Sequence, residues 1–313
     1  MTQPPAIEIK NLTKTYAKSK KSPAKTALKG VDLTIPRGSI FGLLGPNGAG
    51  KSTMINILAG LVNKTSGSAN ICGFDISSQT RQARASIGIV PQEIAMDVFF
   101  TPYQALELQA GYYGVPKAKR RSEEILEALG LADKRDAYVR QLSGGMKRRL
   151  LIAKALVHNP PVLILDEPTA GVDIELRRQL WTYVQELHRR GTTIILTTHY
   201  LEEAEALCDR IAIMHHGEIV ANESKEGLMS RLDKRTLVIT PMEPITTLPS
   251  ELRGLDASLN ESGQIAIHYR SGTDSISAML AKVKTAGISI LDLRTEEPDL
   301  EDVFLSLTYA ANA

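Results

Sequence analysis

The glycine-rich segment at residues 45–53 has one lysine and two hydroxyl side chains at a spacing that suits phosphate binding. It reads GPNGAGKST, matches the pattern GxxxxGK[ST], follows an apolar run at 40–44 and precedes a helical pattern. In such a loop the backbone N–H groups turn toward phosphate oxygens, Lys51 reaches the terminal phosphates and the Ser52 hydroxyl is available to Mg²⁺. The candidate phosphate-binding residues are Gly45, Asn47, Gly48, Gly50, Lys51, Ser52 and Thr53.

Two adjacent carboxylates end a second apolar run. Residues 162–165 are continuously apolar, and Asp166 and Glu167 follow directly. Ionised carboxylates are costly to bury unless they face a cation or water. A metal-and-water site explains the pair, with Asp166 in the Mg²⁺ shell and Glu167 orienting and deprotonating an attacking water. Taken alone, the pair is also compatible with an acidic helix cap at a strand end.

A serine followed by two glycines lies between these motifs. Residues 142–146 read LSGGM, in which Ser143 suits a helix cap, and Gly144 and Gly145 permit a close backbone approach to an anion. This segment resembles the LSGGQ signature of the ATP-binding cassette (ABC) family. Met146 replaces the family's glutamine, which removes a polar contact.

The order and spacing of the three motifs resemble the ABC family across about residues 6 to 222. The resemblance implies ATP and Mg²⁺ as cofactors, ATPase activity, and a head-to-tail homodimer. In that dimer Ser143, Gly144 and Gly145 of one chain contact the γ-phosphate of the ATP held by the other.

The same resemblance assigns four further positions. Tyr16 lies where the family stacks an aromatic ring under adenine. Gln92 matches the glutamine that joins Ser52 and Asp166 in the Mg²⁺ shell and senses the membrane partner. His199 matches the histidine that contacts the γ-phosphate and positions the general base, and Asp173 lies where the family has an aspartate at the dimer boundary, although the residues before it depart from the family pattern. The implied catalytic set is Glu167, His199 and Gln92.

The charge balance argues against nucleic-acid binding. The net charge is +2, whereas a nucleic-acid-binding domain is strongly basic. Lysines at 18–25, in an expected loop, and the basic run at 117–121 are interpreted as solvated faces, with contact to anionic lipid as the alternative. Residues 147–149 (KRR) follow the signature, and either add to the field around phosphate or form an exposed helix face.

The apolar pattern predicts an α/β fold. Residues 7–9 and 31–35 alternate, as half-exposed antiparallel strands do, whereas 40–44, 162–165 and 192–197 are continuous apolar runs typical of a parallel sheet covered on both faces. Together with the resemblance, this predicts a P-loop NTPase of the ABC type with a mixed sheet core, an antiparallel β subdomain and an inserted helical subdomain, plus a small C-terminal α+β domain.

The predicted domains are a nucleotide-binding domain at 1–224, containing the helical subdomain at about 93–160, and an accessory domain at 229–313. The accessory domain is expected to contain strands at 236–240, 264–269 and 288–293 and helices at 275–286 and 300–308.

The last of these helices lies in a segment, 297–308, that resembles the tail of the daunorubicin-resistance branch of ABC-2-type exporters. The resemblance implies export through a separate ABC-2-type transmembrane permease, at the cytoplasmic face of a bacterial plasma membrane. The apolar stripe Leu300, Val303, Phe304 and Leu307 packs either within the accessory domain or at a dimer contact. Whether that domain regulates the ATPase or holds the dimer together stays open.

Other functions are less compatible with the sequence. Translational ABC ATPases carry two cassettes and the DNA-repair type carries a long coiled coil, neither of which is present; a soluble assembly role and an importer subunit remain alternatives. No window reaches about 18 uninterrupted apolar residues, the length that a membrane-spanning helix requires. The N-terminus lacks a signal-peptide pattern, and the two cysteines form no metal-binding or disulfide pattern.

Overall fold

A computed structural model describes residues 3–18, 23–169, 174–198, 200–230, 234–260, 262–270, 273–297 and 299–310. The chain divides between Ser224 and Lys225 into two units, each described here by itself. No helix in the described part of the chain is long and apolar enough to cross a membrane.

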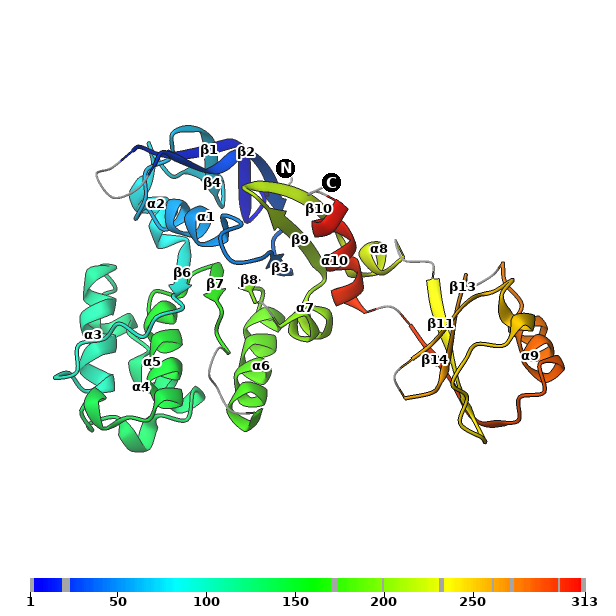
Figure 1. Ribbon diagram of the computed structural model, residues 1–313. Helices are drawn as coiled ribbons and strands as arrows, with labels where there is room; N and C mark the ends of the chain where they lie inside the picture. Colours follow the sequence, from blue (N-terminus) through cyan, green and yellow to red (C-terminus); the bar gives the residue numbers. More distant parts are fainter. Residues whose placement is uncertain are drawn as a thin grey trace. The chain divides into compact units, whose positions relative to one another are not determined.

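A six-stranded sheet in the first unit carries the loops that contain the chemical motifs (Figure 1). Its order is β10-β9-β3-β8-β7-β6, with β10 antiparallel to β9 and the other neighbours parallel. The strands are β3 (Ile40–Leu44), β6 (Ile87–Val90), β7 (Val162–Asp166), β8 (Thr193–Thr197), β9 (Arg210–His215) and β10 (Glu218–Ser224). Because carboxyl ends of parallel strands share one edge, the loops after β3, β8, β7 and β6 emerge side by side.

A four-stranded antiparallel sheet covers one side of this core. Its order is β2-β1-β4-β5, and the expected antiparallel pairing near residues 7–9 and 31–35 is confirmed. Its elements are β1 (Ile7–Tyr16), β2 (Lys25–Ile35), β4 (Ser66–Ile71) and β5 (Phe74–Asp75). Lys25, expected in a loop, begins β2 instead. Ile7, Leu28, Phe41, Met54 and Ile164 belong to one buried core that joins both sheets to α1 (Lys51–Leu58), so the expected α/β fold is confirmed.

Three helices lie between β6 and β7, which are hydrogen-bonded neighbours in the sheet. They are α3 (Pro102–Tyr112), α4 (Ser122–Ala128) and α5 (Gly144–Leu156), and they pack on one another with short 3₁₀ turns between them. A Cβ added to Gly88 of β6 would lie 2.4 Å from the Ala155 carbonyl oxygen, so α5 approaches the sheet closely. The remaining helices of this unit are α2 (Thr80–Ala85), α6 (Ile174–Arg189) and α7 (Leu201–Leu207).

The second unit is a four-stranded antiparallel sheet with one helix on its apolar face. Its order is β12-β13-β11-β14, and its core includes Leu237, Ile267 and Val283. The elements are α8 (Lys225–Met229), β11 (Lys234–Pro241), β12 (Asp256–Leu259), β13 (Ile265–Arg270), α9 (Ile276–Thr285), β14 (Ile290–Glu296) and α10 (Leu300–Ala310). In the apolar stripe of α10, Leu300 and Val303 are buried and α10 packs against α8.

Candidate active site

One cavity of about 190 Å³ gathers residues that are far apart in the sequence. The phosphate-binding loop, the end of β1, the loop after β6 and the residue after β7 all contribute to its lining. The predicted site residues that line it are Tyr16, Asn47, Gly48, Gly50, Lys51, Ser52, Thr53, Gln92 and Glu167.

The loop before α1 has the backbone shape that an anion site requires. Gly50 has φ 114°, and a Cβ there would lie 2.7 Å from the Ala27 carbonyl oxygen, so only glycine fits. Gly45, at φ 155°, would place a Cβ 2.3 Å from the Met214 carbonyl oxygen. No side chain caps α1 at Gly50, so the first N–H groups of the helix are available to a bound phosphate.

Lys51 is a buried cation at this helix start. Its Nζ donates to the carbonyl oxygens of Gly45 at 2.5 Å and Pro46 at 3.3 Å. Burial lowers the pKa of Lys51, while the carboxylates of Glu167 and Asp166 oppose that shift. A buried cation beside free backbone N–H groups fits a polyphosphate.

Asp166 ends β7 beside this cation. Thr197 Oγ1 donates to Asp166 Oδ1 at 2.5 Å. Burial raises the pKa of Asp166, and the Thr197 hydrogen bond, Lys51 and Arg148 counteract the shift only in part. A divalent cation would favour the ionised carboxylate, so Asp166 fits a metal-binding role.

Glu167 points its carboxylate into the cavity from an unusual backbone conformation. Its φ is 47°, a left-handed value that costs a non-glycine residue about 1–3 kcal/mol unless its surroundings impose it. The Glu167 N–H donates to the Thr197 carbonyl oxygen at 3.0 Å and to its Oγ1 at 3.1 Å. Gln92 Nε2 donates to Glu167 Oε2 at 3.0 Å, so these two predicted residues are in direct contact.

Arg148 was missed as a site residue by the sequence interpretation. The reading of the basic run as an exposed helix face is wrong for Arg148, which is only 4% exposed. It shares a face of α5 with buried Leu151, Ile152 and Ala155, at the helical spacing i, i+3, i+4 and i+7, a signal that could have revealed its burial.

The Arg148 guanidinium uses all five of its N–H donors on backbone carbonyl oxygens. Nη1 donates to carbonyls of the loop after β6, whereas Nε and Nη2 donate to carbonyls at the end of β7. The acceptors are the carbonyls of Pro91 (2.8 Å), Gln92 (2.7 Å), Pro168 (2.8 Å), Asp166 (3.3 Å) and Glu167. One side chain therefore ties the helix that follows the signature to both segments that carry cavity residues.

The signature itself lies apart from this cavity. Ser143 caps α5 by accepting a hydrogen bond from the Met146 N–H at 3.2 Å. Ser143 and Gly144 are exposed, and neither they nor Gly145 line the cavity. The backbone N–H groups of Ser143, Gly144 and Gly145 are therefore available to a ligand held by a different molecule.

Asp173 and His199 lie outside the described residues. The residues near them that are described converge on a buried carboxylate in α7. Thr169 Oγ1 and Thr198 Oγ1 both donate to Glu203 Oε2, at 2.9 and 3.0 Å, and Arg177 Nε lies 3.4 Å from Glu203 Oε1. Glu203 therefore links the loop after β7 to the loop after β8.

Replacing Arg148 should lower turnover more than nucleotide affinity. Arg148→Ala leaves five carbonyls without this donor and frees the Gln92 and Glu167 segments, whereas the phosphate-binding loop is untouched. We expect kcat to fall about 100-fold, the scale of a 1 Å misplacement, with Kd for ATP within about threefold. Arg148→Lys, with three donors, should recover part of the loss.

Turnover and fluorescent-nucleotide binding measure these effects, and thermal unfolding shows whether the variants fold. Arg149→Ala is the matched control, because Arg149 Nη1 reaches the carbonyls of Leu129 and Gly130 instead. An equal fall in kcat for both alanine variants, or unchanged kcat for Arg148→Ala, would contradict this role.

Known proteins resemble the chain over nearly its full length. A family model described as ABC transporter matches residues 28–170. The linearmycin resistance ATP-binding protein LnrL of Bacillus subtilis (strain 168) is 39% identical over 310 residues, 96% of this chain and 98% of that protein. The daunorubicin resistance ATP-binding protein DrrA2 of Streptomyces coeruleorubidus is 36% identical over 300 residues, 93% of each chain.

A solved dimeric structure of MJ0796, a bacterial ABC transporter cassette, matches with a TM-score of 0.62 at 30% identity, over 70% of this chain and 98% of that one. These findings confirm the resemblance drawn from the three motifs. The chain belongs to the ABC transporter family and is an ATP-binding subunit with the ATPase cassette fold.

Proposed function

We propose that two copies of this chain hydrolyse Mg-ATP at sites shared between them and thereby power an ABC-2-type export permease. The observation that carries the proposal is the cavity in which Lys51, Gln92 and Glu167 meet at the start of α1. It combines a phosphate-binding loop with a carboxylate held beside the space for an attacking water. The exposed N-terminus of α5 supports the shared site, because Ser143 does not line the cavity of its own chain.

The donor set beside Lys51 fits Mg²⁺. Ser52 offers an exposed hydroxyl, Gln92 an amide oxygen, and Asp166 a carboxylate whose burial raises its pKa. These are the hard oxygen ligands that Mg²⁺ takes, usually through one carboxylate, waters and substrate phosphates. Bound there, Mg²⁺ would neutralise charge on the β- and γ-phosphates.

Glu167 would act as the general base, with Gln92 and the Arg148 hydrogen bonds fixing its position. By resemblance to the family, Tyr16 would stack on adenine, His199 would contact the γ-phosphate and Asp173 would lie at the dimer boundary. The exposed ring of Tyr16 at the cavity supports the first assignment.

Glu167→Gln should retain ATP binding and lose turnover. The amide keeps the shape and the Gln92 neighbour but cannot accept the proton of water, so kcat should fall about 10²- to 10⁴-fold. Glu93→Gln is the matched control, since Glu93 is exposed and does not line the cavity. Phosphate release under saturating Mg-ATP measures the effect, and wild-type turnover in Glu167→Gln would remove Glu167 from the base role.

Export is supported by the names of two relatives, which refer to resistance to linearmycin and to daunorubicin. Compound resistance of this kind is consistent with removal of the compound from the cell. We assign the chain a peripheral position at the cytoplasmic face of a bacterial membrane, where its permease would bind it.

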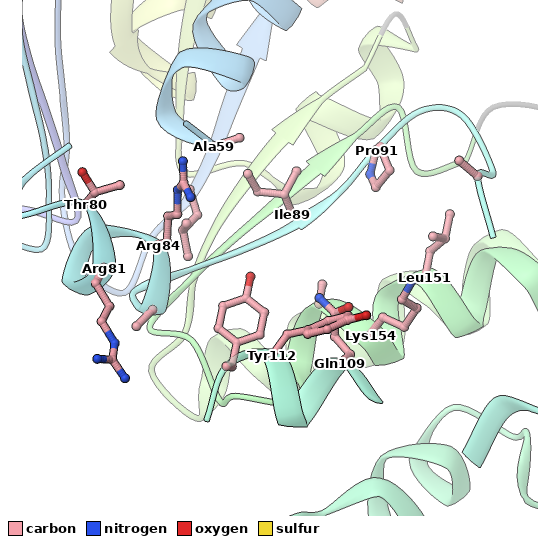
Figure 2. Close-up of a pocket in the computed structure, with 15 residues that line it drawn as sticks. Ala59, Thr80, Arg81, Arg84, Ile89, Pro91, Gln109, Tyr112, Leu151 and Lys154 are labelled. Atoms are coloured by element: carbon pink, nitrogen blue, oxygen red, sulfur yellow. The ribbon is translucent and has the colours of Figure 1, made fainter. Parts of the chain in front are cut away.

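A second cavity, of about 720 Å³, offers a surface for that permease beside the loop that carries Gln92 (Figure 2). It lies between α2 and β6 on one side and helices α3 and α5 on the other. Its described lining contains three cations, Arg81, Arg84 and Lys154, and no carboxylate. Burial lowers the pKa of Lys154, which forms no ion pair in the described part of the chain.

An acidic cytoplasmic segment of the permease would complement these cations. Its movement would reach Gln92 through Pro91, which lines the cavity and whose carbonyl accepts from Arg148. ATP-driven motion of the helices around α5 would thus be passed to the membrane subunit.

Lys154→Glu should uncouple the cassette from the permease. The new carboxylate would repel an acidic permease segment. Recovery of the permease with tagged protein from solubilised host membranes should therefore fall about tenfold, while ATPase activity of the isolated chain stays within about twofold. Lys119→Glu, an exposed change in the same group of helices, is the matched control. Thermal unfolding shows whether both variants fold. If both are folded and recover equal amounts of permease, this cavity is not the docking surface.

A further inference from the structure

The accessory unit exposes one strand along its whole length. All seven residues of β14 are exposed, and no described strand pairs with its outer side. Leu291 is 64% and Leu293 is 43% exposed. An open strand edge with apolar side chains is a ready template for another strand.

The side-chain pattern of β14 is self-complementary. Leu293 is flanked by Asp292 and Arg294, which share the opposite face of the strand. If two copies of β14 lie antiparallel about a twofold axis at Leu293, each Leu293 faces the partner subunit's Leu293. Each Asp292 then faces the partner subunit's Arg294, and the reverse pair forms on the other side of the axis.

Neighbouring registers are unfavourable. Because side chains alternate between faces, a symmetric antiparallel pair can be centred only on a residue. A centre at Asp292 would place two aspartates opposite each other, and a centre at Arg294 would place two arginines opposite each other. Like charges directly opposite destabilise a strand pair, so the charges favour the register centred on Leu293 over both of these neighbours.

We propose that β14 pairs with β14 of a second copy in this register, as a dimer contact separate from the shared ATP site. The pairing is short, because the ladder with β11 shifts register between Thr240 and Pro241, opposite Leu291. A few cross-strand pairs bind weakly by themselves. In cassettes that already dimerise, however, a second contact whose linker spans both sites acts at millimolar effective concentration, so the pairing would keep two chains together after nucleotide leaves.

Cysteine cross-linking of the full chain tests the register. Directly opposite residues have Cα atoms about 4.5–5.5 Å apart, within disulfide reach, so Leu293→Cys should give a covalent dimer under mild oxidation without nucleotide. Thr295→Cys is the matched control, because its symmetry mate would lie more than about 10 Å away. The native Cys72 and Cys208 are buried, which limits background.

Charge reversal tests the same register by a second measurement. Asp292→Arg or Arg294→Asp alone places like charges opposite each other and should weaken nucleotide-free dimerisation at least about fivefold by sedimentation. The double swap restores both opposite-charge pairs between the strands but removes the Arg294–Glu296 ion pair of 2.9 Å within each strand, so Kd should return from the single-variant value toward that of wild type.

The proposal is overturned if the Leu293→Cys variant forms no dimer, if the Thr295→Cys variant cross-links equally, or if the double swap stays as weak as the single variants. Cross-linking of the Leu293→Cys variant to a different polypeptide in host membranes, in place of a second copy, would also overturn it. None of these residues belongs to the ATP site, so ATPase activity of the wild-type chain is a separate readout.

Discussion

A buried guanidinium is stable only when its donors all find acceptors, and this requirement organises the nucleotide-binding unit. Arg148 lies on α5, which is anchored to the sheet where Gly88 permits close contact. Its five hydrogen bonds draw the segment carrying Gln92 and the segment carrying Glu167 onto that helix. A displacement of α5 therefore has to move the segments that carry Gln92 and Glu167 or break these buried hydrogen bonds.

The end of β7 is held from a second direction by Glu203. Thr169 and Thr198 donate to one oxygen of this buried carboxylate, so the loops after β7 and β8 begin from a common anchor. Residues 166–169 are consequently fixed by a buried cation on one side and a buried anion on the other. This accounts for the left-handed backbone of Glu167, which would be strained in isolation.

The sequence was most informative where the chemistry is local. Residues 45–53 specify their turn, helix start and candidate phosphate-binding groups within nine positions, and the continuous apolar runs identify the buried parallel strands because each run is complete in itself. The contact between Gln92 and Glu167 joins positions 75 residues apart, so only resemblance to a family could suggest it. The burial of Arg148 was not predicted, because residues 147–149 were interpreted by their charge and not by their helical spacing.

Short, polar elements were also missed, such as β4, β5 and β12, since a strand of few apolar residues has no period to detect. In the accessory unit the main strands and helices were predicted, but the exposure of β14 follows from strand order, which the pattern of one strand does not contain.

If each ATP site needs two chains, two variants with different defects should complement each other, which tests the shared site most directly. Lys51→Ala removes the phosphate-binding cation and Ser143→Arg blocks the signature, so each homodimer should be inactive. In an equal mixture half of the dimers are mixed and hold one intact site of two, so turnover should return to about one quarter of wild type. No recovery on mixing, or full activity of Ser143→Arg alone, would show that one chain completes its own site.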